Sequence, residues 1–225
     1  MYQEVFHLRR DTRDYTLRLI GGLSERQLQF SAPDRLRLFE LPFLPLKMLS
    51  PSRPRWSVSE VADHLILFET IFRQNISTII QLKKSGRDPV LHIGFRELNA
   101  SFGFIPQAFL PLLELPIGTL THLLPTAVVE FLIGHRLLPA QTPDVAAPRT
   151  GRTKDALCED LRGSLTASEE LFTADPNLDY RHMYRQHPVT GRLNVLEAVR
   201  IVALHEQRHQ RQIQEILDDA AFPKS

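Results

Sequence analysis

The stretch that most constrains the fold is Leu193–Leu217, because its 25 residues include neither proline nor glycine. A continuous helix of this length would extend about 37 Å at 1.5 Å per residue. His205 and His209 lie four residues apart near its centre and therefore project from one face. Apolar residues share that face at helical spacing: Ala198, Ile201, Val202, Ile213 and Ile216. The segment is therefore predicted to be a core helix of a bundle, with two histidines inside its apolar stripe.

These two histidines indicate a ligand, because a buried imidazole needs hydrogen-bond partners. A lone histidine in an apolar stripe is usually an ordinary core residue, whereas two histidines that point the same way are harder to supply with hydrogen-bond partners from the core. His64 offers a third imidazole, since it lies between Val61 and Phe68 in the apolar stripe of an upstream segment. Three imidazoles on two facing helices would hold a borderline divalent metal and leave positions for water or substrate. We therefore predict a metal centre formed by His64, His205 and His209.

Gln212 is the predicted helper of this centre. It follows His209 by three residues and stays in the sector of the helix that carries the histidines. Its amide would orient a ligand imidazole or a water molecule at the metal. The alternative is an ordinary polar residue at the edge of the bundle.

The residues from His205 to His209 also match the H-E-x-x-H signature, in which two histidines hold zinc and the glutamate is a general base. The extended form of that motif asks for glycine and histidine three and six residues later, where this chain has Gln212 and Glu215. Glu206 also projects from the flank of the helix rather than from the histidine face. A zinc protease is therefore kept as a lesser alternative.

Composition narrows the class of protein. A net charge of +1 gives no electrostatic reason to expect nucleic acid or an anionic membrane as a partner. A single cysteine, Cys158, excludes an internal disulfide framework and suits a reducing compartment. The most apolar window, Ile117–Leu138, is interrupted by charged residues, histidines and a proline, so it is not a predicted membrane span. The expectation is a cytoplasmic protein with one domain, residues 1–225, and no signal peptide.

Three further helices are predicted. Residues 3–21 show helical periodicity, with Val5, Leu8, Leu17 and Ile20 among the apolar positions, and end at two glycines. Ser57 and Glu60 form a capping box, with Trp56 just before it, and predict a helix that runs to about Lys84. Leucines at helical spacing predict another helix over Lys154–Thr173. Together with the last helix, these make an all-α, four-helix bundle.

The segments between these helices are predicted to be irregular. Residues 31–55 contain five prolines and are expected to be an extended linker. Residues 89–150 are a long insertion between the second and third core helices, with a short helix near 126–138; their apolar residues predict a lid over the metal site, with a packed loop or a dimer contact as alternatives. Residues 174–192 are predicted to be a polar loop, and no strand is expected. The remaining histidines are not predicted ligands: His7, His92, His122, His135, His182 and His187, the last two being solvated.

Two stretches carry a resemblance to a known family. The tryptophan-led helix start from Trp56 to Leu65, which includes His64, resembles the DinB / YfiT-like superfamily. So does the end of the chain, where the segment from His187 to Val195 leads into the pattern of His205, three residues, His209, two residues and Gln212. The resemblance covers the first, second and last helices, about two-thirds of the chain.

The resemblance implies a four-helix bundle that holds a divalent metal on three histidines, which match His64, His205 and His209. It also implies thiol chemistry, since relatives include transferases that use bacillithiol or mycothiol and a mycothiol-dependent maleylpyruvate isomerase. The insertion at 89–150 is bulkier than in a minimal member of the family, so the substrate of this chain cannot be inferred from the substrates of relatives.

The favoured hypothesis is a metal-dependent enzyme whose three-histidine centre activates a thiol or water for attack on a small electrophile. Zinc or nickel is the favoured metal, with iron or manganese as alternatives, and a low-molecular-weight thiol is the expected cosubstrate. The expected partner is a small-molecule substrate, and a homodimer is left open. The competing hypothesis is a non-catalytic, stress-related bundle that only binds a metal or a small molecule. An open coordination position favours the enzyme, and a closed site with four protein ligands favours the competing hypothesis.

Overall fold

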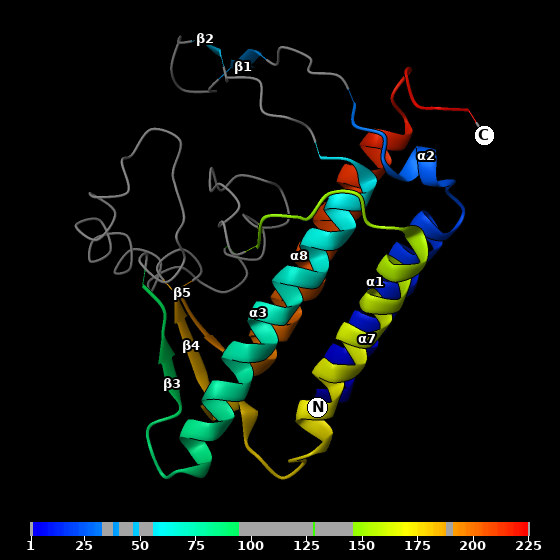
Figure 1. Cartoon of the computed structure of the whole chain (residues 1–225). Coiled ribbons are helices and arrows are strands. Elements are labelled where there is room, and N and C mark those ends of the chain that lie inside the picture. The colour runs from blue at the N-terminus through cyan, green and yellow to red at the C-terminus, as the bar shows by residue number, and fades with distance from the viewer. Residues whose placement is uncertain are drawn as a thin grey trace.

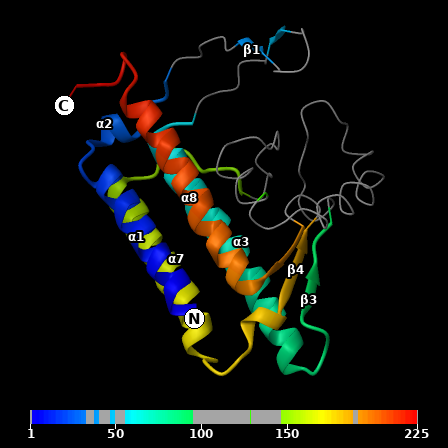
Figure 2. The same ribbon diagram turned by 180° about the vertical axis from the view of Figure 1, so that it is seen from behind.

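Four long helices form the body of the protein. The computed structural model describes residues 2–32, 38–40, 47–49, 56–94, 128, 146–187 and 191–224. The helices are α1 (Tyr2–Gly21), α3 (Val58–Lys84), α7 (Lys154–Thr173) and α8 (Val195–Leu217). They run side by side as a bundle in which α1 and α3 each pack on α7 and α8 (Figures 1 and 2). The predicted four-helix bundle is therefore confirmed.

Local sequence signals set the ends of these helices. The Ser57 hydroxyl accepts a hydrogen bond from the Glu60 amide at 3.2 Å, and the Glu60 carboxylate accepts one from the Ser57 amide at 2.8 Å. This capping box starts α3 where the sequence predicts. Asn194 and Glu197 form a second one, so α8 begins two residues later than predicted. A short helix α2 (Glu25–Leu28) follows α1, and Leu28 is buried in the core.

A small sheet at one end of the bundle corrects the expectation that the chain has no strand. Strand β4 (Tyr184–His187) pairs in parallel with β3 (Val90–His92) and antiparallel with β5 (Gly191–Asn194). The residues of β4 that face inward are Arg185 and His187, so the strand has no apolar alternation to reveal it. Part of the predicted polar loop is thus a hairpin, preceded by a 3₁₀ turn at Tyr180–His182.

The connecting segments are described in part. Within the predicted linker, strands β1 (Leu38–Glu40) and β2 (Lys47–Leu49) pair antiparallel, which corrects the expectation of an irregular chain there. Apart from Val128, the predicted helix near 126–138 lies outside the described residues, and so do 95–127 and 129–145. The insertion as a lid and the single domain stay predictions. In the described part of the chain, no helix is long and apolar enough to cross a membrane.

The centre of the bundle contains a buried network of four charged side chains. Arg9 and Arg13 of α1 meet Glu69 of α3 and Glu206 of α8, and no side chain of the four is more than 3% exposed. The Nη1 atom of Arg9 donates to Glu206 at 2.8 Å, and Arg13 donates to Glu69 at 2.6 Å and to Glu206 at 2.8 Å. Each carboxylate also accepts a serine or threonine hydroxyl, from Ser164 and Ser168 or from Thr16. The two positive and two negative charges cancel, and hydrogen bonds replace the lost hydration.

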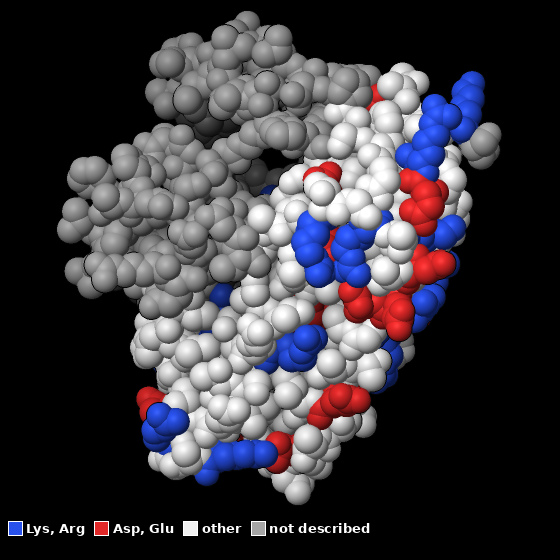
Figure 3. Space-filling view, in the orientation of Figure 1, with Lys and Arg blue, Asp and Glu red and all other residues white. Residues whose placement is uncertain are grey.

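This network lies between two apolar clusters. One cluster includes Ile20, Ile66 and Ile213, and the other includes Phe6 and Val199. On α1 the buried residues are Phe6, Arg9, Thr12, Arg13, Thr16 and Ile20. Of the four apolar positions predicted for this helix only Ile20 is fully buried, since charged side chains occupy the core-facing register. On the face shown in Figure 3, by contrast, basic and acidic side chains are interspersed at the surface.

The network makes stability depend on pH. Burial alone would raise the pKa of the Glu69 carboxyl, but Arg9 and Arg13 outweigh it and lower the pKa to about 2, from an ordinary value of 4.5. Between these values the unfolded state holds more protons than the folded one, so stability falls as the pH falls. We expect this residue to account for a loss of roughly 3 kcal/mol between pH 4.5 and pH 2.

Urea unfolding of the chelator-treated protein between pH 7 and pH 2 measures this loss, with Glu69→Gln as the comparison. Titrating groups outside the network contribute equally to both proteins, so the difference reports Glu69 together with its coupling to Glu206 through the shared arginines. The variant should show the shallower acid dependence below pH 4.5, and parallel curves would contradict the assignment.

Candidate metal centre

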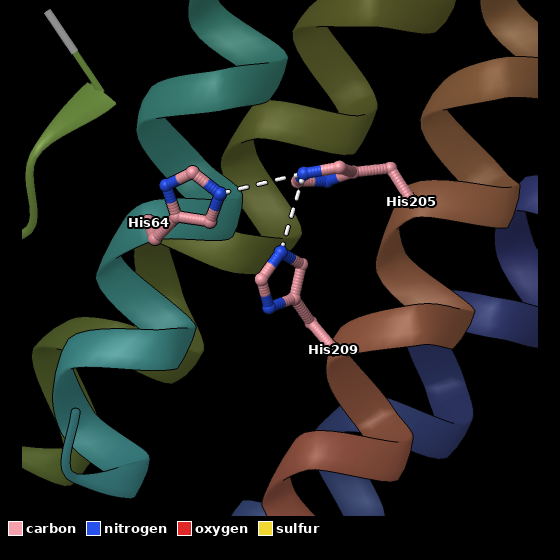
Figure 4. A group of neighbouring side chains, drawn as sticks. All are labelled: His64, His205 and His209. Carbon is pink, nitrogen blue, oxygen red and sulfur yellow. Dashed lines mark hydrogen bonds between the residues drawn. The ribbon is translucent and has the colours of Figure 1, made fainter. Parts of the chain in front are cut away.

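Three imidazoles converge between α3 and α8. His64 projects from α3, and His205 and His209 project from successive turns of α8 toward it (Figure 4). The Nε2 atom of His205 lies 3.4 Å from Nε2 of His64 and 3.2 Å from Nε2 of His209. Each of the three residues offers one ligand atom, and these atoms all lie within 4.8 Å of one another. The structure therefore brings together the three histidines that the sequence predicted as ligands.

Two of the three nitrogen separations fit a metal with tetrahedral geometry. Two nitrogens that each hold zinc at about 2.0–2.1 Å with a tetrahedral angle between them are about 3.3–3.4 Å apart. The nitrogens of His205 and its two neighbours match that separation. Three histidines would occupy three of the four positions around a tetrahedral metal. Among the described residues, they form the one group of three or more side chains placed to hold a metal ion.

Hydrogen bonds on the outer side of the rings set two of the three tautomers. The Nδ1–H of His64 donates to the carbonyl of Ala146 at 2.8 Å, since a carbonyl can only accept. The Nδ1–H of His209 donates to Oε1 of Gln212 at 2.9 Å. Both rings therefore present an Nε2 lone pair to the centre. Gln212 thus contacts a candidate ligand, as the sequence predicted, and its role in catalysis stays a prediction.

Aromatic side chains hold the remaining ring and cover one side of the site. The ring of Phe68 stacks on the ring of His205, with centroids 3.7 Å apart and planes 11° apart. No described residue is a hydrogen-bond partner of Nδ1 of His205, so stacking orients this ring. Trp56 contacts the rings of His64 and His209, at centroid distances of 4.8 and 6.2 Å. It stands just before the cap of α3, so the helix start itself places an indole over the site.

Electrostatics favour a cation at the centre. Burial, with the nearby Arg208 guanidinium, lowers the pKa of His64 to about 4. Burial and the two other imidazoles lower the pKa of His205 well below its usual range. These rings are therefore neutral at pH 7, and His205 can donate an Nε2 proton to only one of its two neighbours. Without a cation, at least one of the two close nitrogen pairs would lack a hydrogen bond, and a divalent metal that binds all three nitrogens would relieve this.

The glutamate of the H-E-x-x-H match does not face this centre. Glu206 accepts hydrogen bonds from Arg9, Arg13 and Thr16 in the buried network on another side of α8. Burial would raise the pKa of the Glu206 carboxyl, but the two arginines lower it below its usual range. A general base must reach the proton that it removes, and this carboxylate is enclosed by cations instead. The structure thus removes the base that the zinc-protease alternative requires.

The other histidines are distributed as follows. His7, His92 and His182 are exposed, while His122 and His135 lie outside the described residues. The prediction that His187 is solvated is wrong, because it is buried on β4 with 8% of its surface exposed. Burial, with the charge of Arg185, lowers its pKa well below the usual range. His187 is not part of the three-histidine cluster.

Sequence reasoning missed two contributors to the site. The carbonyl of Ala146 had no signal, because any residue carries a carbonyl and Ala146 lies at the end of the insertion. Phe68 was predicted as an apolar stripe residue, one helical turn after His64, but its stacking on His205 depends on how α3 meets α8. The spacing of four residues between His64 and Phe68 is the signal that could have found it.

Comparison with known proteins gives one match. The model of the DinB superfamily matches residues 9–213, a segment that includes the three histidines, Trp56 and Gln212. No curated protein and no solved structure matches this chain.

Proposed function

The chain belongs to the DinB superfamily, and from this membership and its three convergent imidazoles we propose that it is a metal-dependent enzyme that activates a thiol or water for attack on a small electrophile. The observation that carries the proposal is the facing of the Nε2 atoms of His64, His205 and His209 at 3.2 and 3.4 Å. Three protein ligands leave a coordination position for a reactant, as catalytic sites require.

The surrounding residues prepare the three rings for this task. The Ala146 carbonyl and the Gln212 amide keep the protons of His64 and His209 on the outer nitrogens. Trp56 and Phe68 provide apolar contact with the rings and reduce access of water from their side. A divalent ion held by His64, His205 and His209 would supply Lewis acidity and allow a thiol or water to lose its proton near neutral pH. Gln212 keeps His209 oriented and takes no proton itself.

The proposal extends to the reactants and the setting. An all-imidazole set suits zinc or nickel better than manganese, and iron remains a weaker candidate. The proposed cosubstrate is a low-molecular-weight thiol and the partner is a small molecule, not nucleic acid or a membrane. The proposed compartment is the cytoplasm, in keeping with a single cysteine, Cys158. A homodimer, with the insertion at the contact, is the alternative to a monomer.

Metal content and thiol transfer together test this proposal. Protein purified without a nickel column should hold about one divalent ion per chain, since three neutral imidazoles form one site. It should also accelerate addition of glutathione, cysteine, bacillithiol or mycothiol to a chromogenic electrophile, or hydrolysis of an activated ester. His205→Ala should lose the metal and reduce the rate to the uncatalysed level. Elemental analysis and absorbance assays measure both.

A matched control comes from an exposed histidine. His182 hydrogen-bonds to Asp179 at the surface, away from the cluster, so His182→Ala should keep metal and rate. Stoichiometric metal without turnover of any thiol or ester would instead support the non-catalytic binding bundle. Absence of divalent metal even after incubation with zinc would overturn the proposal.

A further inference from the structure

The carbonyl of Ala146, which accepts a hydrogen bond from His64, belongs to a segment that also binds Asp63, the residue before His64 on α3. Residues 146–152 cross α3 before the chain enters α7 (Figure 1). At one end of this segment the Ala146 carbonyl accepts the Nδ1 proton of His64. Three residues later, the Arg149 amide donates to Oδ2 of Asp63 at 2.7 Å. Because successive helical residues point about 100° apart, one crossing segment can contact both Asp63 and His64.

The Asp63 carboxylate gathers four hydrogen bonds from this segment. Besides the amide, the Arg149 side chain donates to Oδ2 at 3.2 Å and to Oδ1 at 2.7 Å, and Arg152 donates to Oδ1 at 2.9 Å. The Asp63 side chain is fully buried, whereas the Arg149 side chain is 58% exposed. The buried carboxylate of Asp63 therefore has a fixed position on α3, and the two arginines of the segment bind it from the solvent side.

The far end of the segment has further anchors. Arg152 also donates to Asp160 of α7 at 2.7 Å, and its carbonyl accepts from Gln29 at 2.8 Å and from Ser59 at 3.3 Å. Between 146 and 149, the hydrogen bonds that join the segment to described residues are those to His64 and Asp63. Loss of the contacts with Asp63 should therefore displace the Ala146 carbonyl more than it displaces Arg152, which has other anchors.

We propose that Asp63 is a positioning residue for the metal centre: it holds the segment 146–152 on α3, so that the Ala146 carbonyl keeps the proton of His64 on Nδ1 and leaves Nε2 to bind the metal. We call this segment the clasp. If the clasp opens, the proton of His64 can move to Nε2, where it blocks the lone pair. The inference rests on the proposed metal site, and coupling of this kind is reciprocal, so metal binding also closes the clasp.

Zinc affinity of Asp63→Asn tests the inference. This variant keeps the shape of the side chain but removes the charge that binds two arginines, and competition with a chromophoric chelator should show affinity weakened about 10- to 100-fold. Arg149→Ala removes an exposed side chain but keeps the hydrogen bond from its backbone amide to Asp63. Its zinc affinity should therefore lie between those of Asp63→Asn and the wild type. Asp160→Asn is the matched control, because its hydrogen bond with the clasp is the one to Arg152, and the zinc affinity of this variant should remain that of the wild type.

Two measurements separate positioning from a general loss of structure. In chelator-stripped protein with ¹⁵N-labelled histidine, His64 should be the Nδ1–H tautomer in the wild type and a mixture of tautomers in Asp63→Asn. Zinc should slow tryptic cleavage after Arg149 in the wild type but not in His64→Ala. Both readouts report the ring or the clasp directly, and melting curves establish that each variant is folded.

The outcomes distinguish the two proposals. A wild type that does not bind zinc overturns the proposed function, and the tautomer comparison still decides whether Asp63 orients His64. A wild type that binds zinc, with Asp63→Asn equal to it in affinity and tautomer, overturns the clasp alone. Equal losses in Asp63→Asn and Asp160→Asn would also overturn it, because they would show a general effect of removing a carboxylate near Arg152.

Discussion

Replacing Glu69 by alanine should lower the free energy of unfolding by about 3–5 kcal/mol, because it breaks a buried ion pair and leaves the partner charge uncompensated. Among the described carboxylates, Glu206 would then be the one that Arg9 and Arg13 share, in a region where no side chain of the network is more than 3% exposed. The hydroxyls of Ser164 and Ser168 would each lose a carboxylate acceptor and keep a backbone carbonyl as the alternative. Urea denaturation at pH 7 measures the change.

A surface ion pair that joins α1 to α7 provides the control. Arg10 of α1 donates to Glu169 of α7 at 2.7 Å, with the arginine side chain 55% exposed. Glu169→Ala should cost at most about 1 kcal/mol, since water replaces the lost contact. A loss for Glu69→Ala as small as that for Glu169→Ala would show that the network contributes little to the folded state.

The network also explains how α8 is oriented. Burial of four charges is a costly way to gain stability, since apolar residues of similar volume often stabilise a core as well or better. On α8, Glu206 and Gln210 bind α1, while His205 and His209 point toward α3. Hydrogen bonds are directional, so the contacts with α1 fix the rotation of α8 about its axis. We infer that this rotation is what presents both histidines to His64.

Removing the metal with a chelator should lower the melting temperature of the wild type and leave that of His205→Ala unchanged. A ligand that binds only the folded state stabilises it by about 4 kcal/mol when its free concentration is about 1,000 times the dissociation constant. For a chain of this size that corresponds to roughly 8–16 °C. The variant lacks the central nitrogen, which lies within 3.4 Å of both others, so it has no site to lose.

Differential scanning fluorimetry with and without the chelator measures these shifts. His182→Ala, altered at an exposed histidine, should respond to the chelator as the wild type does. Equal shifts in the wild type and in His205→Ala would contradict a metal held by the histidines, because the chelator would then act elsewhere.

The helices were predictable because their signals are local. The capping box of Ser57 and Glu60 sets the start of α3, and the leucine spacing in Lys154–Thr173 reproduces the bounds of α7. Most of a helix's hydrogen bonds join residues four apart in sequence, so periodicity and caps contain most of the information. The strands were not predictable in the same way, since β3 and β4 pair across about 90 residues and the inward side chains of β4 are polar.

The sequence by itself determined which side chains of the candidate site share a face. His205 and His209 point the same way on any helix, and His64 stands in the core register of another. Only the tertiary structure decided that these rings meet, that Glu206 turns to Arg9 and Arg13, and that a carbonyl at Ala146 receives the His64 proton. The sequence states each side chain, but every residue has a backbone carbonyl, so nothing in the sequence distinguishes the one at Ala146. A charged residue at a core position is indistinguishable from a surface residue in the sequence until its partner on another helix is known.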